Sequence, residues 1–160
     1  MRPKLIFSDS NENVIKQLRQ AFEGCPELTA LMLKPDELPK LDGLDALFLT
    51  LIAAERWGPR LIFYKSQVLK TRPEDRAMPP YIVTGIAMNV DDPRTRDPSS
   101  ELKLVITAVL DAVESYNSEN GDPIKTVGLW TNMLSVDSVD PIEAGQIIRL
   151  IYEDKGRATA

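Results

Sequence analysis

Short, largely continuous apolar runs alternate with helically spaced apolar residues along most of this 160-residue chain. The runs at 46–49 and 81–88 carry apolar residues on consecutive positions, which is typical of strands buried on both faces. Between 102 and 113, by contrast, apolar residues recur at the three- and four-residue spacing of an amphipathic helix. The alternation predicts an α/β fold of three layers, with helices flanking a mostly parallel or mixed central sheet.

Cap residues mark where the expected helices begin. Asp9 and Glu12 have the spacing of a capping box, in which two side chains satisfy free amides reciprocally. Asp97 and Asp140 each stand before a proline, which suits an N-cap followed by the first helical residue. We therefore expect helices on both faces of the sheet, over 14–22, 101–117 and 141–152, and sheet strands at 5–7, 46–49, 82–87 and 127–129.

The length suits one domain, which we place at residues 1–153, with 154–160 as a flexible C-terminal tail. Residues 28–33 are expected to form a further strand and 51–57 a short helix. The stretch 58–80 contains four prolines and several charged residues. We expect a long loop there, in which 61–64 or 67–69 forms a short strand.

Composition excludes several kinds of chemistry. The chain has no histidine, which removes Ser-His-Asp and Cys-His catalysis and histidine-ligated metal sites. Cys25 is the one cysteine, and Glu23 and Glu27 beside it disfavour a reactive thiolate. A net charge of −5 works against binding to nucleic acid or to an anionic membrane. The apolar runs are too short to span a bilayer, which takes ~20 residues, so we expect a cytoplasmic protein.

The expected topology locates a candidate site. In open α/β sheets, ligands bind beyond the carboxyl ends of the strands, which here are followed by the loops 8–11, 50–57, 89–97 and 130–140. Hydroxyl, amide and charged side chains in these loops are the groups that would contact a ligand. Our candidate ligand-binding residues are Asp9, Asn11, Thr50, Arg94, Thr131 and Asn132.

No motif in these loops specifies a cofactor or metal. Neither glycine-rich phosphate-binding pattern, G-x-x-x-x-G-K-[ST] or G-x-G-x-x-G, occurs in the chain. The loop 91–97 holds three aspartates, but Arg94 and Arg96 between them neutralise the cluster, so we predict no metal site. Arg94 either clamps an anionic ligand or pairs with these aspartates, as surface charges commonly do. Trp130 either stacks on a planar ligand or, as we favour, closes the core.

Residues 45–50, Asp-Ala-Leu-Phe-Leu-Thr, resemble the central strand of the macro domain, a module that binds ADP-ribose and related nucleotides. The later elements also follow in that family's order. The family's two glycine-rich phosphate loops correspond here to 50–55 and 131–135, which contain no glycine. The resemblance implies a binding or scaffold module for a nucleotide-like small molecule, with degenerate phosphate loops. We expect no cofactor. A hydrolase of ADP-ribose derivatives is the alternative. Both require Thr50, Thr131 and Asn132 to line one cleft.

A second resemblance covers the first half of the chain. Residues 5–11 resemble the first strand and acidic loop of a response-regulator receiver domain, and 81–84 resemble the strand that ends in its switch Ser/Thr. Thr50 stands where that family has its phosphoacceptor aspartate. The resemblance implies a pseudo-receiver that acts through protein contacts, which requires Asp9 and Thr84 to lie on one rim of the sheet.

Overall fold

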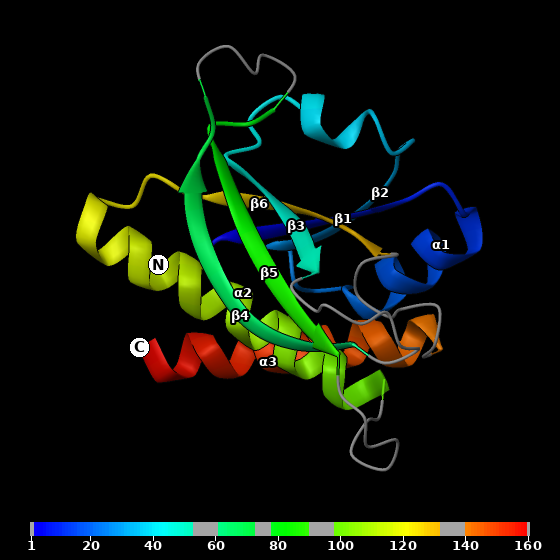
Figure 1. Ribbon diagram of the computed structural model, residues 1–160. Coiled ribbons are helices and arrows are strands. Elements are labelled where there is room, and N and C mark those ends of the chain that lie inside the picture. Colours follow the sequence, from blue (N-terminus) through cyan, green and yellow to red (C-terminus); the bar gives the residue numbers. More distant parts are fainter. Residues whose placement is uncertain (1, 53–60, 73–77, 90–97, 132–139, 160) are drawn as a thin grey trace.

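The computed structural model describes residues 2–52, 61–72, 78–89, 98–131 and 140–159 (Figure 1). The strands are β1 (Lys4–Asp9), β2 (Leu28–Met32), β3 (Ala46–Ile52), β4 (Leu61–Lys70), β5 (Tyr81–Asn89) and β6 (Thr126–Trp130), and the α-helices are α1 (Glu12–Ala21), α2 (Pro98–Asn120) and α3 (Pro141–Thr159). They form one sheet in the order β2-β1-β6-β3-β5-β4. Every neighbouring pair is parallel except β5 and β4, which are antiparallel.

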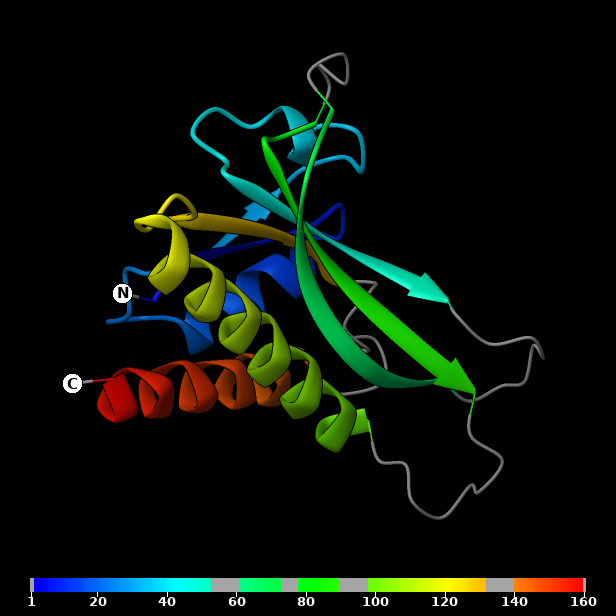
Figure 2. The same ribbon diagram turned by 60° about the vertical axis from the view of Figure 1, so that its left-hand side comes forward.

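The α/β class and the mostly parallel, three-layer arrangement predicted from the sequence are confirmed, and all four predicted sheet strands lie in the sheet. The two outer layers differ in kind (Figure 2). On one face, α1, α2 and α3 share a buried cluster with strand side chains such as Phe7, Phe48 and Leu129. On the other, Leu38 of the 3-10 helix η1 (Leu38–Lys40) packs with Leu44 and Leu47. We expected helices on both faces; among the described residues, the second face is covered by η1 and its loops alone.

The direction of the chain connections explains this asymmetry. The connections β1–α1–β2 and β5–α2–β6 step in the same direction across the sheet, whereas the connection from β2 to β3 steps in the opposite direction. Because crossovers between parallel strands are nearly always right-handed, connections that step in opposite directions lie on opposite faces. The β2–β3 connection contains Pro35 and Pro39, and prolines in a helix interior prevent a long helix from forming.

The stretch 58–80 differs from its prediction. Instead of a long loop with one short strand, residues 61–70 form the ten-residue strand β4, which pairs with β5 as a hairpin. The register shifts between Phe63 and Lys65, so the alternation of side chains that signals a strand is interrupted there. Leu51 and Ile52 extend β3 where a short helix was predicted, and 53–57 lie outside the described residues.

Two of the predicted helix boundaries need correction. Asn11, and not Asp9, is the N-cap of α1, because Asp9 still belongs to β1. The sequence placed 154–160 in a flexible tail, whereas α3 continues to Thr159 and Lys155 Nζ donates to Asp111 Oδ1. The other starts agree: α2 begins at Pro98 and α3 at Pro141, with Asp140 Oδ2 accepting from Glu143 N at 3.3 Å. Asp97 lies outside the described residues.

We predict that Val109→Asp severely destabilises the fold. Val109 lies in the apolar stripe of α2 and has no exposed surface, so the variant buries an unpaired carboxylate. The expected loss is on the order of several kcal/mol of unfolding free energy. Leu104→Asp on the same helix is the matched control, because Leu104 is 45% exposed. Denaturant unfolding of both variants is the measurement, and a wild-type-like Val109→Asp would contradict the assignment of this face to the core.

Tyr152 joins the start of the chain to α3. Its side chain is 1% exposed, its hydroxyl donates to Pro3 O at 2.8 Å, and its carbonyl accepts from Arg2 Nη1 at 2.7 Å. The Arg2 guanidinium lies 4.4 Å from the ring centroid. Burial of the phenol raises the pKa of Tyr152 from 10.0 to about 12, because the phenolate would lose its hydration.

This shift predicts an alkaline loss of stability. A pKa raised by folding favours the protonated folded state, so its contribution is complete below pH 10.0 and is lost as the pH rises toward 12. Tyr152→Phe lacks the titrating group. The unfolding free energies of wild type and Tyr152→Phe, measured from pH 8 to pH 11.5, should therefore converge as the pH rises, by the linkage of protonation to folding. A difference that stays constant with pH would contradict this account of Tyr152.

Candidate functional site

A hollow of about 280 Å³ lies at the carboxyl ends of β1 and β6. These two strands are neighbours in the sheet, and their register places Ser8 beside Trp130. The β1–α1 turn and the residues that follow β2 complete the walls. The lining residues are Ser8, Asp9, Ser10, Asn11, Leu33, Pro35, Trp130 and Thr131.

The Asp9 carboxylate is fixed in this hollow by donors from two elements. Its Oδ1 accepts from Asn11 N at 2.7 Å, and its Oδ2 accepts from the hydroxyl of Thr131, which directly follows β6 and is 1% exposed. Asn11 is fixed in turn, because its Oδ1 accepts from Asn13 N at 2.9 Å and caps α1. A carboxylate has about four acceptor positions, so Asp9 can still accept hydrogen bonds from a ligand.

Two buried polar atoms of the hollow have no hydrogen-bond partner in the described part of the chain. They are the hydroxyl oxygen of Ser8, a residue that is 1% exposed, and Nε1 of Trp130. Residues paired in a parallel register point to the same face of a sheet, so the two side chains lie on one face. Buried polar groups in proteins are nearly always paired with protein, water or ligand. This end of the sheet therefore carries hydrogen-bonding capacity that its described residues leave unused.

The structure brings some of the predicted ligand-binding residues together. Asp9, Asn11 and Thr131 line the same hollow. Thr50 lies in β3 opposite Gly85 of β5, three residues beyond the last rung of the β3–β6 ladder, which pairs Leu47 with Gly128. Arg94 and Asn132 lie outside the described residues.

Sequence reasoning missed Ser8, which it placed in a turn after the first strand. Ser8 belongs to β1, and its side chain points to the face opposite that of Phe7. Its position directly after the apolar run 5–7 was the signal that could have placed it inside the strand. For Trp130 the favoured core interpretation agrees with its packing against the cluster around Leu38 and Leu47, but its indole nitrogen also borders the hollow.

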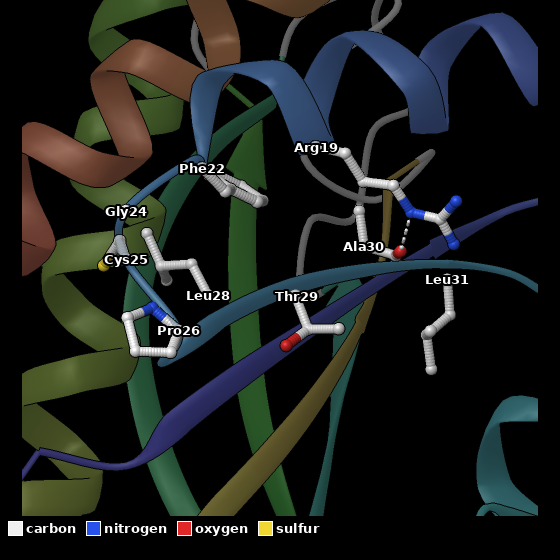
Figure 3. A pocket seen from close by; sticks show the side chains of 9 residues that line it. All are labelled: Arg19, Phe22, Gly24, Cys25, Pro26, Leu28, Thr29, Ala30 and Leu31. Carbon is white, nitrogen blue, oxygen red and sulfur yellow. Dashed lines mark hydrogen bonds between the residues drawn. The ribbon is translucent and has the colours of Figure 1, made fainter.

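Two other hollows are nearly twice as large, but they offer fewer polar groups to a ligand. One of about 540 Å³ lies beside the edge strand β2 and is lined by Arg19, Cys25 and mostly apolar residues (Figure 3). Burial, together with a hydrogen bond to Glu27, raises the pKa of the Cys25 thiol and keeps it protonated. Another of about 530 Å³ lies between α1 and α3. Among the described residues, no buried unpaired side-chain atom lines either hollow.

Thr84, the residue that resembled the switch Ser/Thr of a receiver domain, lies away from the hollow of Asp9. Thr84 lies in the middle of β5 and not at a strand end, 4% exposed, and its hydroxyl donates to Gln67 O at 3.1 Å. The β3–β5 register pairs it with Leu49, and the pseudo-receiver alternative stays a prediction. Within the described ranges, no group of three or more acidic or cysteine side chains is arranged to hold a metal ion, and no helix is long and apolar enough to cross a membrane. The aspartates of 91–97 lie outside these ranges.

Comparisons of the chain with protein-family models, with curated proteins and with solved structures find no match.

Proposed function

We propose that this chain is a cytoplasmic binding module for a small, nucleoside-like molecule that sits in the hollow at the carboxyl ends of β1 and β6. The observation that carries the proposal is the Ser8 hydroxyl, which is buried and without a partner in the described residues, beside the fixed carboxylate of Asp9. Hydroxyl or amino groups of a ligand can donate to the Ser8 hydroxyl oxygen and to the Asp9 carboxylate. The ligand can also accept a hydrogen bond from Trp130 Nε1.

Charge and size favour an uncharged ligand. The lining includes the Asp9 carboxylate and, among the described residues, no lysine or arginine, so a phosphate group would be repelled. The volume of about 280 Å³ lies just below the range of typical small-molecule sites, roughly 300–1,000 Å³, which favours a small ligand. The macro-domain resemblance of 45–50 supports a nucleoside-like ligand, and the missing glycines of 50–55 and 131–135 support the loss of its phosphates.

The first test is calorimetric titration with two probes, adenosine and ADP-ribose. We expect adenosine to bind with a dissociation constant between about 1 μM and 1 mM, and ADP-ribose to bind more weakly or not at all. Absence of adenosine binding at about 1 mM would contradict the nucleoside proposal. A low-micromolar ADP-ribose constant, about −8 kcal/mol, would contradict the degenerate-loop interpretation and favour the hydrolase alternative.

The second test separates a ligand contact from a structural role. Ser8→Ala removes an unpaired buried hydroxyl, so the free protein should keep or slightly raise its melting temperature, whereas adenosine affinity should fall about tenfold. Ser66→Ala is the matched control. The Ser66 hydroxyl is also buried without a partner in the described residues, but it lies on β4, away from the hollow. Adenosine affinity that falls equally in both variants, or in neither, would contradict the role of Ser8.

A further inference from the structure

We propose that the free edge of β2 is a self-association surface, on which β2 of a second copy pairs antiparallel, and that Arg19 blocks this pairing in the monomer. The inference does not depend on the proposed ligand site. It rests on the backbone directions of β2, on the difference between the two edges of the sheet, and on one hydrogen bond from α1.

The backbone of β2 has a bonded side and an open side. Glu27 O accepts from Leu5 N at 3.0 Å and Leu33 N donates to Asp9 O at 3.2 Å, so the odd-numbered residues direct their backbone groups toward β1. Because these directions alternate along a strand, Leu28, Ala30 and Met32 direct theirs away from the sheet. Leu28 N is bonded to Cys25 O within a turn, at 3.1 Å. The other groups directed toward an incoming strand are the amides of Ala30 and Met32 and the carbonyls of Leu28, Ala30 and Met32, of which the Ala30 carbonyl already accepts from Arg19 Nε.

The two edges of the sheet are built differently. The edge strand β4 carries the exposed Lys70 and a register shift after Phe63, which are features that discourage edge-to-edge pairing. The edge strand β2 reads Leu-Thr-Ala-Leu-Met, with an unbroken register to β1 and no charged residue. Its protection therefore has to come from outside the strand.

A two-fold axis at Ala30 makes β2 complementary to itself. An antiparallel copy centred there pairs Ala30 with Ala30 and Leu28 with Met32, and the outward amides then face outward carbonyls. Met32 is 55% exposed in the monomer and would be covered by this pairing. The ends of the segment also differ in charge, because Glu27 precedes the strand and Lys34 follows it. Antiparallel pairing brings the acidic end of one copy to the basic end of the other, with Glu27 opposite Leu33, the neighbour of Lys34.

Arg19 occupies the centre of this edge. Its Nε donates to Ala30 O at 2.8 Å, which places a guanidinium where the second strand would lie (Figure 3). Hollows of about 540 and 290 Å³ flank the edge, and both are lined by Arg19 and Leu31. Around a two-fold axis at Ala30, the Arg19 side chains of both copies would also meet and repel each other. Removing Arg19 therefore frees an acceptor and removes a like-charge contact.

Sedimentation velocity of Arg19→Ala tests the proposal. We expect this variant to form dimers at concentrations where the wild type is monomeric. Lys16→Ala is the matched control: Lys16 lies one turn earlier on α1, with its side chain 68% exposed and paired with Glu12 at 3.4 Å, and its loss should leave the monomer unchanged. Arg19→Ala that stays monomeric at about 1 mM, or Lys16→Ala that dimerises equally, would overturn the proposal.

A second substitution identifies the surface. Met32→Lys, added to Arg19→Ala, puts a charge beside Leu28 of the second copy and should restore the monomer. Leu150→Lys on α3 is its control, because Leu150 is 63% exposed and lies away from β2, so the double variant should remain dimeric. Dimers that survive Met32→Lys would overturn the assignment to β2. Arg19→Met, which keeps the apolar length of the side chain, replaces Arg19→Ala if circular dichroism shows that the alanine variant is not folded.

Discussion

The sheet depends on a short junction at its centre. The strands β2, β1 and β6 on one side and β3, β5 and β4 on the other are joined by a β3–β6 ladder of two residue pairs, Ala46 with Val127 and Leu47 with Gly128. Asp45 reinforces that ladder at the amino ends, where its Oδ2 accepts from Lys125 N at 2.8 Å and from Thr126 N at 3.1 Å. A Cβ on Gly128 would lie 3.1 Å from Leu38 and Leu44, so the missing side chain lets the η1 layer pack onto the junction.

The two ends of the central strands therefore have different roles. At the amino ends, the Asp45 carboxylate and the Thr126 hydroxyl are bonded to each other and to neighbouring backbone, which leaves little for a ligand to contact. At the carboxyl ends, Asp9 is fixed but Ser8 and Trp130 keep polar atoms without partners in the described chain. The Asp-Ala pair that suggested a macro domain thus includes an aspartate that stabilises the sheet, whereas the candidate site uses a different aspartate on β1.

The periodicity of apolar residues predicted most of the helices and strands, because burial of those residues alone determines these elements. The stripe through Val109 and the continuous runs of β3 and β5 can be buried in one way only, and the structure has them as predicted. Prediction failed where pairing with a neighbouring strand determines the local structure. The register shift after Phe63 interrupts the alternation that would have indicated β4. Asp9 remains in β1 because it pairs with Met32 of β2. The location of the candidate site was predictable, since parallel strands end together. Its walls were not, because Leu33 and Pro35 of the β2–β3 connection line the same hollow as Ser8 only once the chain has folded.

The ligand site lies at the carboxyl ends of β1 and β6, whereas the association surface is the outer edge of β2. Leu33 N points inward and donates to Asp9 O, whereas the groups proposed for pairing belong to Leu28, Ala30 and Met32 and point outward. An incoming strand at the outer edge therefore adds hydrogen bonds without replacing any that hold β1 to β2. Because Ser8 lines neither hollow beside that outer edge and Arg19 does not line the hollow of Asp9, each proposal can fail while the other stands.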